Sequence, residues 1–274
     1  MQPKLGIIAG GGDLPKLVIE ACRESGRAFY VVALEDHFDF SLDDDVPHGI
    51  YRMNRAGDIA DALVEQNVAE VVMAGRVRRP ALKDIMMDRR SAALLLRIGG
   101  LALGDDGLLR GVSRAFEDHG FRVIGADQIV ADLLAPRGIL GQHEPDSQAL
   151  ADIEIGIAAA RQLGAQDLGQ AVIVRAGELL DTEDEAGTAA LVARCAPVDG
   201  TRSGVLVKML KPGQDRRVDL PTIGPDTITE IDRAGLEGVA VEAGRSLILK
   251  RLEVIREADR LGVFVLGSAP EADI

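Results

Sequence analysis

Short hydrophobic runs alternate with amphipathic stretches along the first half of the chain. Pro15 suits the first turn of the first amphipathic stretch, and Gly26 suits its end. Strands that alternate with helices predict a parallel sheet with right-handed crossovers, and therefore a Rossmann-like domain. The runs that predict strands are residues 4–10, 29–34, 49–53, 69–75 and 121–126. Helical spacing is found at residues 16–26, 56–67, 84–100 and 104–120.

The second half has a different pattern, which begins after a segment rich in proline and glycine. Residues 135–146 contain two prolines and two glycines with little periodicity, which indicates a linker. The expected fold class is α/β, with a Rossmann-like parallel-sheet domain over residues 1–135 and a mixed α/β domain over residues 136–274. In the second domain we expect helices at 146–164, 185–195, 226–235 and 251–262. We expect a strand or hairpin at 170–180 and strands at 204–210, 238–243, 246–250 and 263–267.

The composition supports a folded protein with an aliphatic core. Of the 274 residues, 47% are hydrophobic and only 3% are aromatic, a balance that favours helices packed on a sheet rich in Val, Ile and Leu. Cys22 and Cys195 stand alone without metal-binding spacing, so we expect both in the core.

The charge and hydrophobicity of the chain limit its partners. A formal net charge of -13 argues against nucleic-acid binding, which needs a basic surface, but it allows an anionic ligand in a locally basic pocket. No hydrophobic run reaches the roughly 18 residues that suggest a membrane span. We therefore expect a cytoplasmic protein, and if it contacts lipid we expect the contact to be peripheral.

Three consecutive glycines follow the first predicted strand. Gly10, Gly11 and Gly12 would let backbone N–H groups approach a phosphate or a ribose at the start of the next helix. The spacing is neither G-x-G-x-x-G nor a P-loop, so a tight turn without a ligand is the alternative. Gly75 and Arg76 close another predicted strand. Because ligands bind beyond the carboxyl ends of parallel strands, the two turns could share a crevice; the alternative is that one or two of Arg76, Arg78 and Arg79 are surface residues.

The densest mixture of charge lies in a stretch broken by glycine and proline, VLVKMLKPGQDRRVDLPTIGPDT, residues 205–227. A diphosphate bound with Mg²⁺ would explain this mixture, because lysines offset phosphate charge and carboxylates hold the metal. Surface salt bridges explain it equally well, and Asp226 has the alternative role of capping the next helix. The charged residues are Lys208, Lys211, Asp215, Arg216, Arg217, Asp219 and Asp226.

Other polar residues at predicted helix starts also have two interpretations. Thr188 follows a glycine and could contact a phosphate or cap its helix, whereas Asp105 and Asp106 are better explained as caps. The four histidines show no metal-binding spacing, which favours structural or exposed positions.

Six segments, in this order, together resemble the UDP-2,3-diacylglucosamine pyrophosphatases of the LpxI type. They are LGIIAGGGDLP, AGRVRRP, GDDGLLRGVSRAFEDHGF, DLGQAVIV, VLVKMLKPGQDRRVDLPTIGPDTI and GVAVEAGRSLIL. The resemblance extends from about residue 4 to residue 267. It implies a Mg²⁺-dependent hydrolase of lipid A biosynthesis that splits UDP-2,3-diacylglucosamine into UMP and 2,3-diacylglucosamine 1-phosphate (lipid X).

The resemblance also implies site residues. Asp226, Lys208 and Lys211 would be catalytic. Where the family pattern reads Glu-Gly-Thr-Asp, this chain has Ala186-Gly187-Thr188-Ala189, so the metal role falls to Asp226 and Asp219. The implied substrate-binding residues are Gly11, Gly12, Ala74, Gly75, Arg76 and Val77 on the nucleotide side and Gln170 and Thr188 on the diphosphate and glucosamine side.

The same resemblance arranges the substrate along the chain. Uridine would lie on the first domain, the acylated sugar phosphate and the metal on the second, and the scissile bond in a groove between them. Water would attack the sugar-side (β) phosphorus. A homodimer and peripheral contact with the cytoplasmic face of the inner membrane follow by analogy, and nucleic acid is not an expected partner.

Two other functions are compatible with parts of the pattern. A NAD(P)-dependent oxidoreductase would use the glycine turn and an acidic residue after the second strand, where Glu35 and Asp36 stand, but the glycine spacing does not match. A non-catalytic module that binds a nucleotide-sugar or lipid would leave UDP-2,3-diacylglucosamine intact in the presence of Mg²⁺.

Overall fold

The chain divides into two compact units in this computed structural model. Unit 1 contains Met1–Ala131 together with Asp215–Asp219, and unit 2 contains Asp132–Gln214 and Leu220–Ile274. A short piece of the later sequence therefore groups with the first half, which the pattern of elements did not predict. The helix predicted at 84–100 lies outside the described residues. The residues that the structure describes are 2–77, 105–195 and 202–269.

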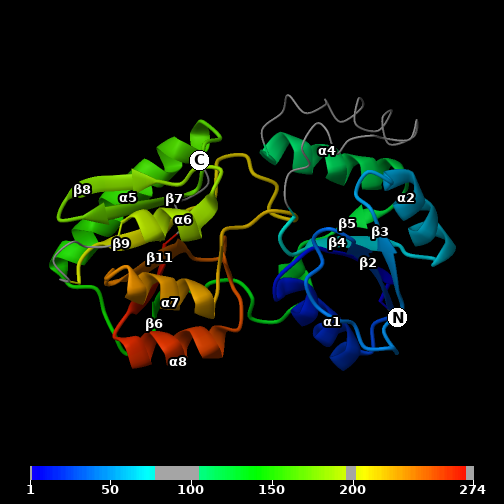
Figure 1. The fold of residues 1–274 in the computed structure, drawn as a ribbon, viewed down its shortest axis with the longest axis horizontal. Helices are drawn as coiled ribbons and strands as arrows, with labels where there is room; N and C mark the ends of the chain where they lie inside the picture. The colour runs from blue at the N-terminus through cyan, green and yellow to red at the C-terminus, as the bar shows by residue number, and fades with distance from the viewer. Residues whose placement is uncertain (1, 78–104, 196–201, 270–274) are drawn as a thin grey trace. The chain divides into compact units, whose positions relative to one another are not determined.

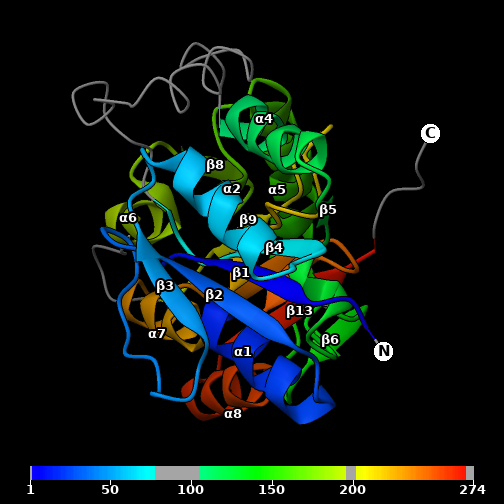
Figure 2. The ribbon, with the colours of Figure 1, turned by 90° about the vertical axis from the view of Figure 1, so that its right-hand side faces the viewer.

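Unit 1 is built on a parallel sheet, which confirms the predicted Rossmann-like half. Its described strands follow the order β3-β2-β1-β4-β5, and each neighbouring pair is parallel (Figure 2). Because β1 pairs with β4 in parallel, the carboxyl ends of these two strands lie side by side. The strands are β1 Leu5–Ala9, β2 Phe29–Leu34, β3 His48–Tyr51, β4 Glu70–Ala74 and β5 Arg122–Val123.

Helices cover both faces of this sheet (Figure 1). Ile59 and Leu63 of α2 join the hydrophobic cluster on one face, and α1 lies against the other. As predicted, α1 has Pro15 in its first turn and ends at Gly26, whose φ of 65° is left-handed. The helices are α1 Leu14–Ser25, α2 Ala56–Glu65 and α4 Asp105–Asp118, followed by a 3-10 turn at Ala126–Gln128.

Unit 2 contains a mixed sheet of six strands in the order β6-β13-β11-β9-β7-β8. The central strands β9, β11 and β13 are parallel, and antiparallel strands flank them on both sides. β6 lies inside the expected linker, where three residues are too few for periodicity to reveal a strand. Its strands are β6 Gly138–Leu140, β7 Ala171–Arg175, β8 Glu178–Thr182, β9 Val205–Lys208, β11 Gly238–Glu242 and β13 Phe264–Ser268. A separate parallel pair is formed by β10 Thr222–Ile223 and β12 Leu247–Ile248.

Alternation along the strands of unit 2 builds a layer on each face of the sheet. Ile173 and Leu206 join α6, α7 and α8 in one cluster, whereas their neighbours Val172 and Val207 join α5 in another. Fully burying one such side chain stabilises the fold by about 1.5–3 kcal/mol. The helices are α5 Ser147–Ala165, α6 Gly187–Arg194, α7 Pro225–Arg233 and α8 Arg251–Leu261.

The two cysteines occupy the interior, as predicted. Cys22 and Cys195 are both buried, and burial raises the pKa of each thiol. A raised pKa keeps the thiol protonated, which makes it a poor nucleophile and metal ligand. Neither cysteine is therefore a candidate for catalysis.

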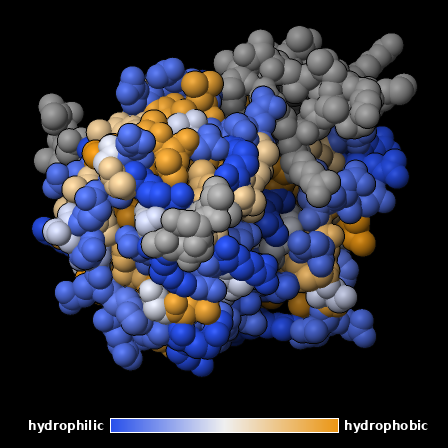
Figure 3. Space-filling model, turned by 60° about the vertical axis from the view of Figure 1, so that its left-hand side comes forward, coloured by the Kyte–Doolittle hydropathy of each residue, from blue (hydrophilic) through white to orange (hydrophobic). Residues whose placement is uncertain are grey.

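The surface of unit 2 is mainly hydrophilic on the face that Figure 3 presents, with smaller hydrophobic groups between. Among the described helices, none combines the length and the hydrophobicity that crossing a bilayer requires. The large hydrophobic side chains exposed on unit 2 include Leu150, Ile155, Leu168, Leu179, Leu180 and Leu252.

A buried carboxylate fixes the β7–β8 hairpin to α5. Asp152 is 1% exposed and accepts hydrogen bonds from the N–H groups of Ala176 (2.9 Å) and Gly177 (2.7 Å) and from Gln148 Nε2 (2.9 Å). Ala176 has a φ of 53° and Gly177 a φ of 84°, so the turn needs left-handed backbone at both positions. Asp152 offsets part of that cost by binding both N–H groups.

Replacing Asp152 by Ala should therefore destabilise the protein. The change removes a charged acceptor from two backbone donors and one side chain, and we expect a loss of about 1–3 kcal/mol in the free energy of unfolding. Urea denaturation measures it, with Glu154→Ala on the exposed side of the same helix as the control. Equal stability of the two variants would contradict the role given to Asp152.

Candidate active site

The two predicted nucleotide-binding turns are joined by backbone hydrogen bonds. The Gly10 N–H donates to Ala74 O (2.9 Å), the Gly11 N–H to Arg76 O (3.0 Å), and the Arg76 N–H to Gly11 O (2.8 Å). They continue β1 and β4 beyond the carboxyl edge of the sheet. Unit 1 thus brings together the residues of both turns, as the sequence predicts.

Glycine is required where these turns touch. Gly75 has a φ of 93°, and a Cβ added there would lie 2.6 Å from Gly11 O. A Cβ on Gly12 would lie 3.7 Å from Arg76 Nε, so the guanidinium lies over that glycine. Arg76 and Val77 are exposed and accessible to a ligand.

The side chain of Asp39 binds the backbone of the glycine turn, a contact that the sequence did not reveal. The Gly12 N–H donates to Asp39 Oδ1 (2.9 Å) and Oδ2 (3.1 Å). A carboxylate already accepts from this amide, so a phosphate there would meet a negative charge and lose its donor. This arrangement suits a hydroxyl donor such as ribose better. Glu35, one of the two acids noted after β2, pairs instead with Arg52 (2.6 Å).

Asp39 lies between two aromatic residues in the chain, Phe38 and Phe40. The rings of Phe38 and Phe40 lie 4.1 Å apart between centroids, and Lys16 Nζ is 4.9 Å from the centroid of Phe40. In the sequence, the contact between Asp39 and Gly12 is indicated only by the local motif His37-Phe38-Asp39-Phe40. The motif does not reveal the partner, because the distance from Asp39 to Gly12 depends on the fold.

Unit 2 brings together three of the residues predicted to face the diphosphate. Lys208 ends β9 and is 5% exposed. Its ammonium group donates to Thr188 Oγ1 (2.9 Å) and to the carbonyl oxygen of Thr222 (3.1 Å). Lys208 pairs in register with Ala171, so Gln170 lies beside it at the start of β7. The ammonium and hydroxyl groups therefore meet at the carboxyl end of β9, and the backbone of Gln170 lies next to them.

Glu183 completes this group, and sequence reasoning missed it. Thr188 Oγ1 donates to Glu183 Oε1 (2.5 Å), and the Gln170 N–H donates to Glu183 Oε2 (2.9 Å). In the described part of the chain, Gln170 Oε1 is a buried oxygen without a hydrogen-bond partner. A donor from a bound ligand would satisfy it. The only signal for Glu183 in the sequence was its place shortly before Gly187-Thr188.

Lys211 is the second buried lysine of the charge-dense segment. It is 9% exposed, and its Nζ lies 3.0 Å from Asp167 Oδ1. Its N–H donates to Gln214 Oε1 (3.1 Å), which fixes the turn after β9. Both lysines are thus held at defined positions by neighbours in unit 2.

Asp226 lies in the first turn of α7, but it does not cap the helix. The N-cap is Gly224, whose N–H donates to Thr227 Oγ1 (3.2 Å) and whose carbonyl accepts the Thr227 N–H (3.0 Å). The capping interpretation was wrong because it requires a helix that begins at Thr227, and α7 begins two residues earlier, at Pro225. Asp226 is exposed, and within the described residues nothing hydrogen-bonds to its carboxylate.

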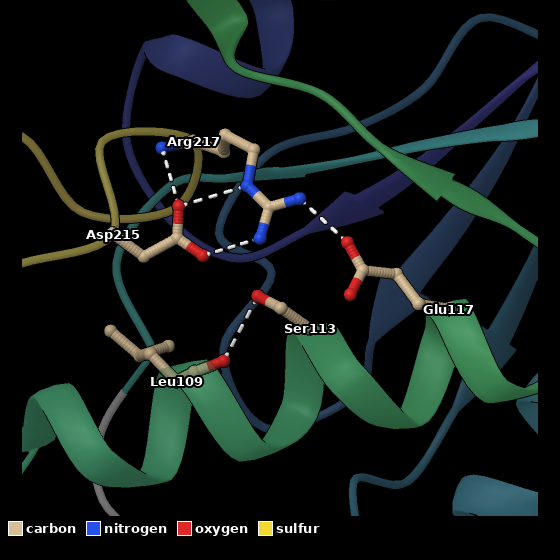
Figure 4. Close-up of polar contacts among 5 residues, drawn as sticks. All are labelled: Leu109, Ser113, Glu117, Asp215 and Arg217. Atoms are coloured by element: carbon tan, nitrogen blue, oxygen red, sulfur yellow. Dashed lines mark hydrogen bonds and ion pairs between the residues drawn. The ribbon is translucent and has the colours of Figure 1, made fainter.

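The other half of the charge-dense segment forms ion pairs within unit 1 (Figure 4). Arg217 binds Asp215 through both Nε (2.9 Å) and Nη2 (2.7 Å), and its Nη1 reaches Glu117 of α4 (2.6 Å). Hydrogen bonds from Arg217 hold the pKa of Asp215 below its usual range. Asp219 belongs to the same short segment, where its N–H donates to Asp215 O (3.2 Å).

The donors present suit a metal ion that is shared with a substrate. Across the described residues, no group of three His, Cys, Asp or Glu side chains could hold a metal by itself. Mg²⁺ usually keeps several waters and binds through one or two carboxylates plus substrate phosphates. The accessible carboxylate of Asp226 fits that mode.

Comparisons with known proteins assign the family. The LpxI N-terminal domain matches residues 4–133, and the LpxI C-terminal domain matches residues 136–266. The chain is 41% identical to the UDP-2,3-diacylglucosamine pyrophosphatase LpxI of Caulobacter vibrioides over 276 aligned positions, covering 98% of each protein.

Two solved structures are only distantly similar. The CobK precorrin-6A reductase aligns with 100% of this chain and 90% of its own at 12% identity and a TM-score of 0.36. The UDP-glucose 4-epimerase of Thermus thermophilus in complex with NAD aligns with 98% and 86% at 13% identity and a TM-score of 0.30. On both domain matches and the identity to the Caulobacter protein, this chain belongs to the LpxI family.

Proposed function

We propose that this protein hydrolyses the diphosphate of UDP-2,3-diacylglucosamine, with Mg²⁺, to UMP and 2,3-diacylglucosamine 1-phosphate. The observation that carries the proposal is the 41% identity, over 98% of the chain, to a UDP-2,3-diacylglucosamine pyrophosphatase. The buried lysines and the exposed Asp226 support it, because a diphosphate needs cations and a metal-binding carboxylate.

In this proposal the lysines of unit 2 stabilise the charge that develops on the diphosphate. Lys208 and Lys211 are nearly buried, where water screens an ammonium group less than at the surface. Groups held in place before the reaction contribute more than mobile ones, because they need not reorganise. Thr188 binds the ammonium group of Lys208, and Gln170 Oε1, which lacks a hydrogen-bond partner among the described residues, would accept a donor from the substrate.

Asp226 of unit 2 is the proposed carboxylate ligand of Mg²⁺, whereas Asp219, the other expected ligand, belongs to unit 1. Bound Mg²⁺ would polarise the diphosphate oxygens and offset their charge. Asp226 is the stronger candidate, because its carboxylate is exposed and is not used in capping. Water would attack the sugar-side phosphorus, leaving UMP as the leaving group.

The nucleotide side of the substrate would bind at the joined turns of unit 1. Gly12 and the exposed segment from Gly75 to Val77 would line this position, and the buried Gly11 and Ala74 lie next to them in the same turns. The carboxylate of Asp39 favours the ribose hydroxyls over a phosphate as its neighbour. Because its substrate is linked to lipid, the protein would contact the cytoplasmic face of the inner membrane peripherally. It would act as a homodimer.

Product analysis tests the reaction directly. Incubation with UDP-2,3-diacylglucosamine and Mg²⁺ in ¹⁸O-water should release UMP and labelled lipid X, and chelation of Mg²⁺ should stop the release. Label in UMP would reverse the assignment of the attacked phosphorus. Intact substrate after prolonged incubation would favour a binding module, and binding of NADH without hydrolysis would favour an oxidoreductase.

Replacing Asp226 by Asn should abolish most turnover while the fold is kept. The amide keeps the size of the side chain but loses the charge that a metal ligand needs, so we expect kcat to fall by about 100-fold or more. Glu253→Gln is the matched control, because Glu253 is also an acid in a first helical turn. Both variants should keep the thermal midpoint within a few degrees, and near-normal kcat in Asp226→Asn would remove this residue from catalysis.

Replacing Asp39 by Asn should weaken recognition of the ribose. We expect the wild-type protein to bind UMP about tenfold more tightly than 2′-deoxy-UMP, because a hydrogen bond to a charged group contributes about 1.5–3 kcal/mol. Asp39→Asn should reduce this ratio towards one, while Asp44→Asn, on the same connection, should preserve it. Calorimetric titration measures both. Tighter UMP binding by Asp39→Asn would instead place a phosphate beside Gly12.

A further inference from the structure

We propose that Glu183 is a positioning residue, which holds the ammonium group of Lys208 in place through the hydroxyl of Thr188. The three side chains form one hydrogen-bonded chain, with distances of 2.5 Å from Thr188 Oγ1 to Glu183 Oε1 and 2.9 Å from Lys208 Nζ to Thr188 Oγ1. The inference rests on the proposed function, because it concerns the cation that would face the diphosphate.

The direction of each hydrogen bond follows from the chemistry of the end groups. A lysine ammonium can only donate, and an ionised carboxylate can only accept. Thr188 has a single hydroxyl proton, so it must donate to Glu183 and accept from Lys208. With its proton committed to the carboxylate, the hydroxyl presents a lone pair to the lysine. Glu183 therefore determines the orientation of the hydroxyl that Lys208 meets.

Glu183 follows β8 and is itself held in place by hydrogen bonds to the residues at the start of β7. Its second oxygen accepts the Gln170 N–H (2.9 Å), and its own N–H donates to Ala171 O (2.8 Å). A Cβ on Gly169 would lie 2.8 Å from Glu183 O, so this glycine permits the close approach. Ala171 of β7 also pairs in register with Lys208 of β9. The positions of the Glu183 carboxylate and the Lys208 ammonium group are therefore both fixed by β7 and β9.

The burial of Lys208 gives this arrangement its importance. A cation that is 5% exposed has lost most of its hydration and depends on protein acceptors. Thr188 is a neutral acceptor, and the negative charge of Glu183 behind it polarises the hydroxyl toward the lysine. Loss of either group should let the ammonium move from the position in which it meets a phosphate oxygen.

A double-mutant cycle between Glu183 and Lys208 tests this inference. The variants are Glu183→Gln, Lys208→Met and their combination, with a second cycle in which Thr188→Val replaces Glu183→Gln. Hydrolysis of UDP-2,3-diacylglucosamine is followed at saturating and limiting substrate to separate kcat from KM. Glu185→Gln, an exposed acid of the same loop, is the matched control, and thermal unfolding monitors the fold.

Each single variant should lower kcat/KM by about tenfold or more, mainly through kcat, because the lost interaction matters in the transition state. On the Lys208→Met background, Glu183→Gln and Thr188→Val should change kcat/KM by less than about twofold, since residues that act as a unit are not additive. Thr188→Ser keeps the hydroxyl and should restore activity to within about threefold of the wild type.

Two results would overturn this inference without affecting the proposed function. One is a wild-type kcat in both Glu183→Gln and Thr188→Val. The other is a loss of kcat/KM from these changes that is as large on the Lys208→Met background as in the wild type. If Glu183→Gln fails to fold, the cycle with Thr188→Val decides in the same way. Absence of hydrolysis by the wild-type protein would instead overturn the proposed function, and with it the role of Lys208.

Discussion

The candidate site in unit 2 depends on one buried positive charge, the ammonium group of Lys208 at the end of the central strand β9. Lys208 extends from the end of a strand whose four residues are all buried, and only 5% of it is exposed. An ammonium group at such a position must be hydrogen-bonded, because an unpaired buried charge costs several kcal/mol or more. Thr188 and the carbonyl of Thr222 meet that demand and tie α6 and β10 to β9. The site is thus built around a cation.

The charge-dense segment contains two different kinds of interaction, and the fold separates them. Asp215 and Arg217 pair with one another and with Glu117 on partly exposed side chains of unit 1, where such pairs contribute little to stability. Lys208 and Lys211 are buried in unit 2. The salt-bridge interpretation is therefore right for Asp215 and Arg217, and Lys211 also pairs with a carboxylate, that of Asp167. The buried Lys208, which binds a hydroxyl and a carbonyl oxygen, is the cation of the segment that best suits an anionic ligand.

The glycine turn shows how one distant side chain changes what a motif can bind. Backbone amides beside a helix start usually attract phosphate. Here the Gly12 amide is bound by Asp39, which lies 27 positions further along the chain. The motif in the sequence was compatible with either a phosphate or a ribose. The carboxylate favours the ribose, because its hydroxyls can donate to it whereas a phosphate would repel it.

The sequence by itself determined the longer elements and the family, but not the short strands β6 and β10. Hydrophobic spacing predicted the strands around Ile7 and Val207, and Pro15 and Gly26 marked the ends of α1, because these signals are local. The tertiary structure alone decided that Asp39 reaches Gly12, that Glu183 reaches Thr188, and that Asp215–Asp219 belongs with unit 1. Such contacts depend on strand register and on how loops return to a sheet edge. A periodic pattern predicts which side of a helix or strand is buried, but it does not predict which loop contacts the polar residues at the end of that element.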